Sequence, residues 1–151
     1  MRDFQARTVY DWENKYISPL DKYEMSFDEI QDFVEFVWAN LGRSHPPRIK
    51  VGRKNSNRAT GYRLALTFPD KSFFKRRSIV LHELAHALLE DRVIYDDDWQ
   101  IEVGHGPKFV KIYADLLEKF MCLPKEMLWY SLKEAGLNIE ARAVDADVVL
   151  C

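Results

Sequence analysis

Two histidines and a glutamate stand together near the middle of the chain, in the motif HELAH that runs from His82 to His86. If this stretch is helical, positions i and i+4 lie on one face one turn apart, so His82 and His86 can each offer a ring nitrogen to one metal ion. Glu83 adjoins that face and can reach a water molecule on the ion. His-Glu-x-x-His on a helix therefore predicts a zinc site at which Glu83 acts as a general base.

The surrounding residues indicate where this helix lies. The stretch is apolar nearly all round, at Ile79, Val80, Leu81, Leu84, Ala85, Leu88 and Leu89. A helix from about Phe74 to Glu90 with no polar face is expected to be central and buried. Burying two histidines and a carboxylate is costly unless they are satisfied. A zinc ion would satisfy all three, and hydrogen-bonded core histidines are the alternative.

A third ligand must come from elsewhere, because catalytic zinc usually has three protein ligands and one open position. The candidates after the motif are Glu102, His105 and the acidic run 96–98. A metzincin would have a histidine six residues after His86, where this chain has Arg92. We favour His105, because it is one of only four histidines and lies between two glycines at a predicted helix start. Glu102 and the acidic run remain alternatives.

Length and composition are those of one globular domain covering residues 1–151, with residues 137–151 forming a terminal strand or a tail. A hydrophobic content of 47% with 30% charged residues excludes wholesale disorder. No apolar run has membrane-spanning length and the N-terminus does not resemble a secretory signal, so we expect no membrane partner. The two cysteines, Cys122 and Cys151, form neither a disulfide framework nor a CxxC pair. A cytoplasmic location is expected.

Positive charge is concentrated in residues 43–77, which contain eleven basic residues and one acid, Asp70. This net charge of +10 could hold a polyanion such as DNA, or an acidic substrate. The favoured interpretation is nevertheless a solvated β-hairpin whose edge is protected by lysine and arginine. Aromatic residues are sparse in this segment, so a stacking platform for single-stranded nucleic acid is not indicated.

The remaining elements predict an α+β fold, with a small sheet packed on helices around the central motif helix. Ser26 and Glu29 form a capping box for a helix with an apolar stripe, which Gly42 ends. Further helices are expected at residues 2–16 (Phe4, Val9, Trp12 and Tyr16 inward), from Pro107 to Phe120 and from Pro124 to Ala135. Strands are expected at 48–51 and at 62–68, with Tyr62, Leu64, Leu66 and Phe68 on one face and Arg63 on the other. Residues 93–103 are expected to be irregular and His45 to lie in a loop.

The motif helix followed by His105-Gly106-Pro107-Lys108-Phe109 resembles the SprT-like zinc metallopeptidases, whose pattern is HExxH followed by HGxxF. The opening Arg2-Asp3-x-Gln5, with Val9-Tyr10 and Glu13, resembles an uncharacterised group of metallohydrolases from actinobacteria and their phages. The likeness spans roughly residues 2–135. It implies a zincin-like domain with zinc on His82, His86 and His105 and with Glu83 as the base. The cysteine zinc ribbon and the DNA-binding tails of Spartan proteases are absent, so repair of DNA–protein crosslinks is not implied.

Such a site would hydrolyse a carbonyl compound, and a peptide bond is the favoured substrate. In zincin folds the strand before the motif helix commonly pairs with the extended substrate, so the 62–68 strand is expected to do so. Tyr95 and Tyr113 are candidate oxyanion helpers, although packing is the favoured role for both. One alternative is a zinc-stabilised module that binds nucleic acid or protein without cleavage. Another is a hydrolase for a different amide, which the sequence does not separate from a peptidase.

Overall fold

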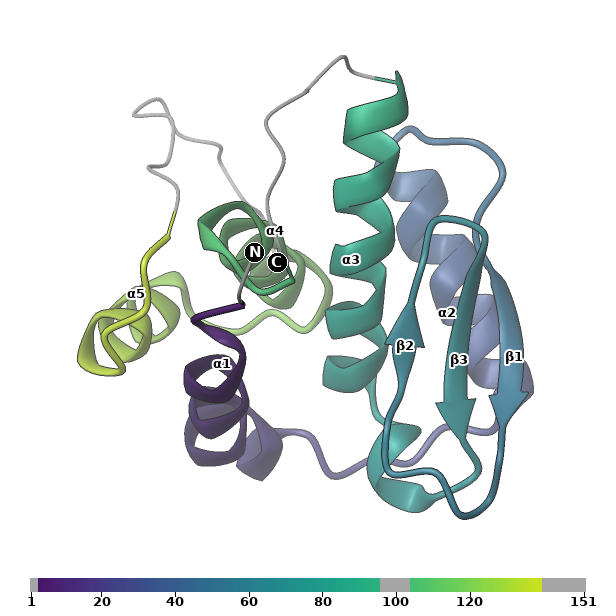
Figure 1. The fold of residues 1–151 in the computed structure, drawn as a ribbon, viewed down its shortest axis with the longest axis horizontal. Helices are drawn as coiled ribbons and strands as arrows, with labels where there is room; N and C mark the ends of the chain where they lie inside the picture. The colour runs from purple at the N-terminus through teal and green to yellow at the C-terminus, as the bar shows by residue number, and fades with distance from the viewer. Residues whose placement is uncertain (1–2, 96–103, 140–151) are drawn as a thin grey trace. The chain divides into compact units, whose positions relative to one another are not determined.

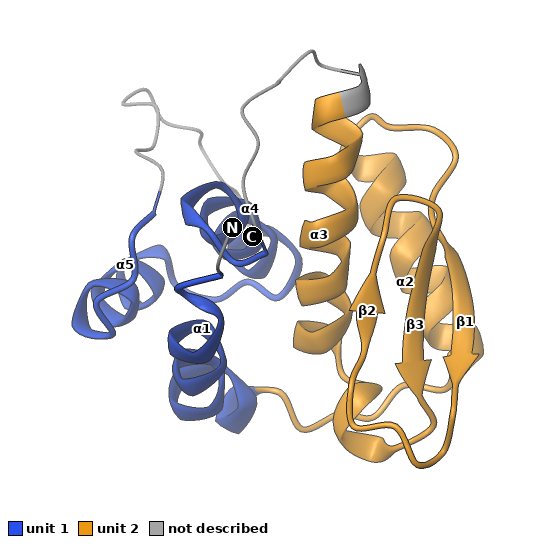
Figure 2. Cartoon of the chain, in the orientation of Figure 1, with its two compact units in different colours: residues 1–20, 99–151 blue, residues 21–98 orange. Residues whose placement is uncertain are grey.

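The computed structural model describes residues 3–95 and 104–139, which form helices and one small sheet (Figure 1). The fold class is therefore α+β, as predicted. The chain divides into two compact units, residues 1–20 with 99–151 and residues 21–98 (Figure 2). Among the described helices, none combines the length and the apolar character that crossing a membrane requires. Of the predicted terminal strand or tail at 137–151, only 137–139 are described, and they lie outside helices and strands.

The sheet of the 21–98 unit has three strands, β1 (Arg48–Gly52), β2 (Thr60–Gly61) and β3 (Ala65–Pro69), in the order β1-β3-β2. β1 runs parallel to β3 with Val51 opposite Phe68, whereas β2 is antiparallel with Gly61 opposite Leu66. Leu66 and Phe68 on the central strand are fully buried. They face the helices of the unit, because α2 (Phe27–Asn40) and α3 (Arg77–Tyr95) both contact the sheet.

The single strand predicted at 62–68 is wrong, because the chain reverses at Tyr62–Leu64 to make a hairpin. The Tyr62 N–H donates to the Ala65 carbonyl at 3.0 Å. Tyr62 and Leu64 are consequently 60% and 77% exposed, whereas Arg63 is buried. The alternation along the predicted strand continues across this turn, and residues 62–64 contain no glycine or proline. The sequence pattern therefore did not reveal the turn. Since β1 and β2 flank β3, the expected pairing of β3 with a peptide is also wrong, and β2 is the edge on that side.

Helix α2 begins as the capping box predicted. The Ser26 hydroxyl accepts from the Glu29 N–H at 3.1 Å, and the Glu29 carboxylate accepts from the Ser26 N–H at 3.0 Å. The Ser26 N–H and the Tyr23 hydroxyl, which donates to Glu29 at 2.7 Å, lower the pKa of the Glu29 carboxyl. The inward stripe of α2 is Ile30, Val34, Val37 and Trp38, and Gly42 follows the helix with φ of +72°.

Helix α3 carries the HELAH motif and begins three residues later than predicted, after the short 3₁₀ helix η3 (Ser72–Phe74). Its first turn contains no acidic residue of its own. Instead, the buried Asp21 carboxylate accepts the Ser78 N–H at 2.7 Å and so caps the helix from 57 positions upstream. α3 continues to Tyr95, so the prediction that Val93–Tyr95 is irregular is wrong; residues 96–103 lie outside the described residues.

The other unit contains α1 (Ala6–Trp12), the π-helix η1 (Glu13–Ile17), the 3₁₀ helix η2 (Ser18–Leu20), α4 (Pro107–Phe120) and α5 (Lys125–Glu134). The Trp12 indole donates to the Ser131 hydroxyl at 2.8 Å, which fixes α1 to α5. The prediction that Phe4 and Tyr16 are core residues is wrong: Phe4 is 82% exposed and Tyr16 is half-buried. The π-helix after Trp12 has a wider turn than an α-helix, which moves the next inward-facing position by one residue. Ile17 is therefore buried where Tyr16 was expected.

Candidate metal centre

The two motif histidines lie one turn apart on α3, as the sequence predicted. Their ring centroids are 5.2 Å apart and the ring planes are inclined by 61°. His82 is buried and His86 is half-buried, with the buried Leu81, Leu84 and Ala85 beside them. The apolar surroundings restrict access of bulk water, which strengthens the interaction of a bound cation with its ligands.

His105 immediately precedes the first turn of α4 and is also buried. Its Nδ1 is 2.7 Å from a carboxylate oxygen of Asp3, and the same oxygen accepts the His105 backbone N–H at 3.2 Å. The carbonyl of His105 accepts from the Gln5 side-chain amide at 2.9 Å. The backbone N–H and the carbonyl of His105 are therefore both hydrogen-bonded to the segment before α1.

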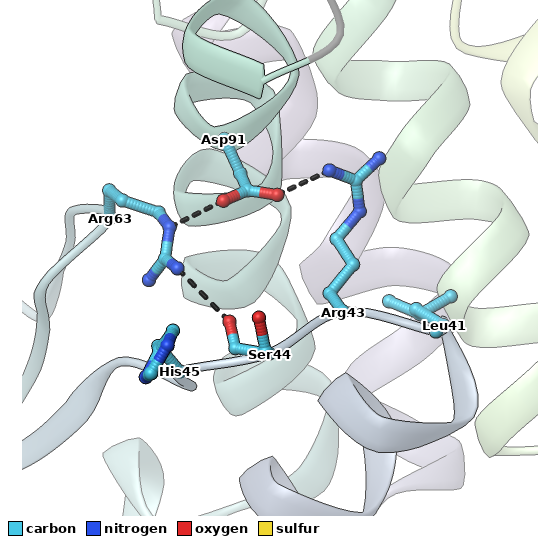
Figure 3. A pocket seen from close by; sticks show the side chains of 7 residues that line it. Leu41, Arg43, Ser44, His45, Arg63 and Asp91 are labelled. Atoms are coloured by element: carbon cyan, nitrogen blue, oxygen red, sulfur yellow. Dashed lines mark hydrogen bonds and ion pairs between the residues drawn. The ribbon is translucent and has the colours of Figure 1, made fainter.

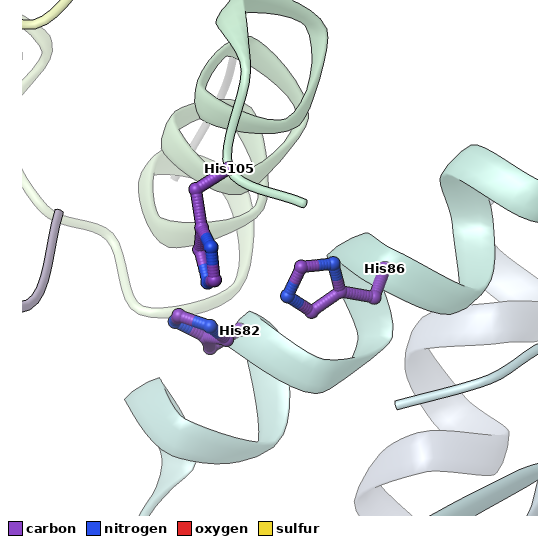
Figure 4. Close-up of side chains that lie close together, drawn as sticks. All are labelled: His82, His86 and His105. Carbon is purple, nitrogen blue, oxygen red and sulfur yellow. The ribbon is translucent and has the colours of Figure 1, made fainter. Parts of the chain in front are cut away.

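The three rings come close enough to share an ion (Figure 4). One ligand atom from each of His82, His86 and His105 lies within 4.8 Å of the other two. Three neutral imidazoles are a donor set suited to zinc.

No family model, curated protein or solved structure matches this chain. The resemblance to SprT-like metallopeptidases therefore stays a prediction, and only the side chains themselves indicate a metal centre.

Glu83 is buried and belongs to the first half of α3. Its backbone lies directly against β2: a Cβ on Gly61 would stand 2.8 Å from both the Cα and the carbonyl carbon of Glu83. Only glycine permits so close an approach of strand and helix. The edge strand of the sheet consequently runs beside the residue that we predict to be the base.

Other predicted site residues lie apart from the histidines or outside the described residues. His45 is exposed in a loop with φ of +59°, as predicted. Tyr113 is 1% exposed and donates its hydroxyl to the buried Glu13 at 2.6 Å, which confirms packing as its role. Glu102, the acidic run 96–98 and the side chain of Tyr95 lie outside what the structure describes.

Sequence reasoning did not assign a role at the site to Asp3, Gln5 or Tyr10. The Tyr10 ring packs edge-on against His105 with centroids 5.2 Å apart, and it is 47% exposed. The sole indication was that these three residues belong to the N-terminal pattern of the resembling group. No local spacing links Asp3 with a histidine 102 positions downstream.

Not all the positive charges of the basic segment 43–77 are available to bind a partner, because some are paired within the protein. Arg43 and Arg63 both pair with the carboxylate of Asp91, and all three line a pocket of about 600 Å³ (Figure 3). The Arg63 guanidinium also lies 4.9 Å from the centre of the Trp38 ring. The exposed charges that remain concentrate in residues 48–58, which contain five basic residues and no acid: Arg48, Lys50, Arg53, Lys54 and Arg58.

Proposed function

We propose that the protein is a zinc-dependent hydrolase, and specifically a metallopeptidase with a zincin-like fold. His82, His86 and His105 would hold the ion, and Glu83 would be the general base. The observation that carries the proposal is the convergence of three imidazoles, two of them buried, within 4.8 Å. A single cation could accept a lone pair from one nitrogen of each ring at once.

The chemistry divides between the ion and the chain. A zinc ion held by these histidines would act as a Lewis acid and would lower the pKa of a bound water towards neutrality. Glu83 would accept the proton of the attacking water and return it to the amine nitrogen of the leaving group. Because Glu83 is buried, its carboxylate acts in surroundings where proton transfer does not compete with bulk solvent.

An extended peptide is the favoured substrate because of the strand beside Glu83. β2 is at the edge of the sheet, and Gly61 brings its backbone against the helix at that residue. A peptide that added to this edge would pass next to the base, held by main-chain hydrogen bonds. The expectation of strand addition therefore transfers from β3 to β2.

The test compares metal content and peptide hydrolysis in four proteins: the wild type, Glu83→Gln, His82→Ala and His45→Asn. The substrate is a mixed peptide library, assayed with and without a chelator. We expect one zinc per chain and chelator-sensitive cleavage in the wild type. Glu83→Gln should retain zinc and lose cleavage, and His82→Ala should lose both.

His45→Asn is the matched control, because His45 is exposed and asparagine tolerates its left-handed backbone. It should behave as the wild type. Cleavage by Glu83→Gln at the wild-type rate would refute the assignment of the base. A wild-type protein that takes up no zinc would refute the metal centre.

A second candidate is a zinc-stabilised module that binds DNA without cleavage, and the exposed charge of residues 48–58 favours it. These five cations would release counterions on binding, so affinity should fall steeply with salt. DNA binding across a salt series, by the wild type and by Lys50→Glu/Arg53→Glu, tests this surface. Salt-dependent binding without peptide cleavage would favour the module. Absence of binding would leave the charges as protection of the β1 edge.

A further inference from the structure

We propose that Asp3 is a positioning residue of the metal centre, which orients the ring of His105 so that Nε2 faces the ion. This inference rests on the proposed metal site and names a residue outside the HExxH and HGxxF motifs. All the contacts that support it lie within one compact unit, which contains both residues 1–20 and 99–151.

One carboxylate oxygen of Asp3 holds His105 at two points. It lies 2.7 Å from Nδ1 and accepts the backbone N–H of the same residue at 3.2 Å. The ring and the main chain are therefore held by one acceptor, which restricts rotation about the bonds that join them. Ring contacts with Phe109 and Tyr10, at centroid distances of 4.8 and 5.2 Å, restrict the plane further.

The contact with Asp3 also selects the tautomer. A carboxylate only accepts hydrogen bonds, so Nδ1 must carry a proton, and in the neutral ring Nε2 then retains its lone pair. A histidine that donates its other nitrogen to a carboxylate is a more basic and better-oriented metal ligand. Asp3 thus has the geometry expected of a carboxylate that does not bind the metal itself but accepts a hydrogen bond from a metal-bound imidazole.

Two neighbouring features keep Asp3 in place. Gly104 has φ of +56°, and a Cβ there would stand 2.6 Å from the Asp3 carboxylate carbon, so a side chain at this position would displace the acid. Gln5 links the same segment to the chain beyond α5: its amide donates to the carbonyls of His105 and Asn138, and it accepts the Asn138 N–H at 2.7 Å. These bonds hold the segment before α1 against the backbone of His105.

The test measures zinc affinity by competition with a chromophoric chelator in the wild type, Asp3→Ala, Asp3→Asn and Asp115→Asn. Asp115 is the matched control, because it is an aspartate of the same unit whose carboxylate pairs with Lys111 on α4. Loss of an outer partner typically weakens metal binding about 10- to 100-fold. We expect that loss for Asp3→Ala and a smaller one for Asp3→Asn, whose amide oxygen still accepts but carries no charge. Asp115→Asn should bind as the wild type does.

Two further readouts separate positioning from a purely structural role. The visible spectrum of the Co²⁺-substituted protein should change in both Asp3 variants, and the melting temperature of metal-free Asp3→Asn should match that of Asp115→Asn. Zinc affinity within threefold of the wild type in both Asp3 variants would overturn the inference. If Asp3→Ala does not fold, the isosteric Asp3→Asn decides. A wild type that binds no zinc would overturn the metal centre itself, whereas zinc binding without peptide cleavage would refute only the peptidase assignment.

Discussion

Replacing Gly61 by alanine tests whether β2 packs against the motif helix as closely as the structure indicates. The added Cβ would overlap the Glu83 carbonyl oxygen and would stand 2.8 Å from the Glu83 Cα and carbonyl carbon, where ordinary contact begins at 3.4 Å. The strand or the helix must therefore move by more than about half an ångström. The atoms in the way are helix backbone, which has no rotamer to change.

The expected cost in unfolding free energy follows from two opposing effects. Overpacking a rigid site typically costs about 1–3 kcal/mol, and we expect the upper end here because backbone meets backbone. Alanine recovers about 0.4–1 kcal/mol by restricting the unfolded chain. The net loss should be about 2 kcal/mol, measured by urea denaturation.

Gly52→Ala provides the matched control within the same sheet. Its Cβ would meet Pro69 N and a Thr67 methyl at 3.3 Å, which a shift of a tenth of an ångström relieves. We expect a change within about 0.5 kcal/mol for Gly52→Ala. If Gly61→Ala were as stable as Gly52→Ala, the close approach of β2 to Glu83 would be wrong.

Two further substitutions test the polar contacts of the 21–98 unit. Asp91→Ala leaves the buried Arg63 guanidinium without its carboxylate and should lower the unfolding free energy by about 3–5 kcal/mol, measured by urea denaturation; an unchanged midpoint would contradict the buried pair. The lowered pKa of Glu29 means that its stabilisation is complete above the ordinary glutamate pKa and is lost as pH falls through the folded-state value. Glu29→Gln should therefore flatten the decline of melting temperature between pH 6 and pH 3, and a curve parallel to that of the wild type would refute the linkage.

Sequence reasoning succeeded where the signal was local. The capping box at Ser26, the proline that starts α4 and the glycine after α5 each depend on neighbours within a few positions, and all three were confirmed. The same holds for the spacing of His82 and His86, because helical periodicity alone places them on one face.

The errors arose where distant contacts decide the local structure. Arg63 was assigned to the face opposite Leu64, and it is buried because Asp91, 28 positions downstream, accepts from its Nε at 2.5 Å. The cap of α3 by Asp21 and the contact of Asp3 with His105 span 57 and 102 positions. A single sequence carries no spacing signal that pairs such residues, since any of many acids could have supplied the carboxylate.

The division of the chain into one continuous and one discontinuous unit affects the order in which the protein can fold during synthesis. Residues 21–98 follow one another, so Asp21 is already available when the ribosome adds Ser78. The partners of Trp12, which are Tyr113 in α4 and Ser131 in α5, are made about a hundred residues later, a delay of roughly 5–20 s at ordinary elongation rates. During that interval the apolar face of α1 lacks its native partners, so the nascent N-terminal segment exposes apolar surface to which chaperones can bind.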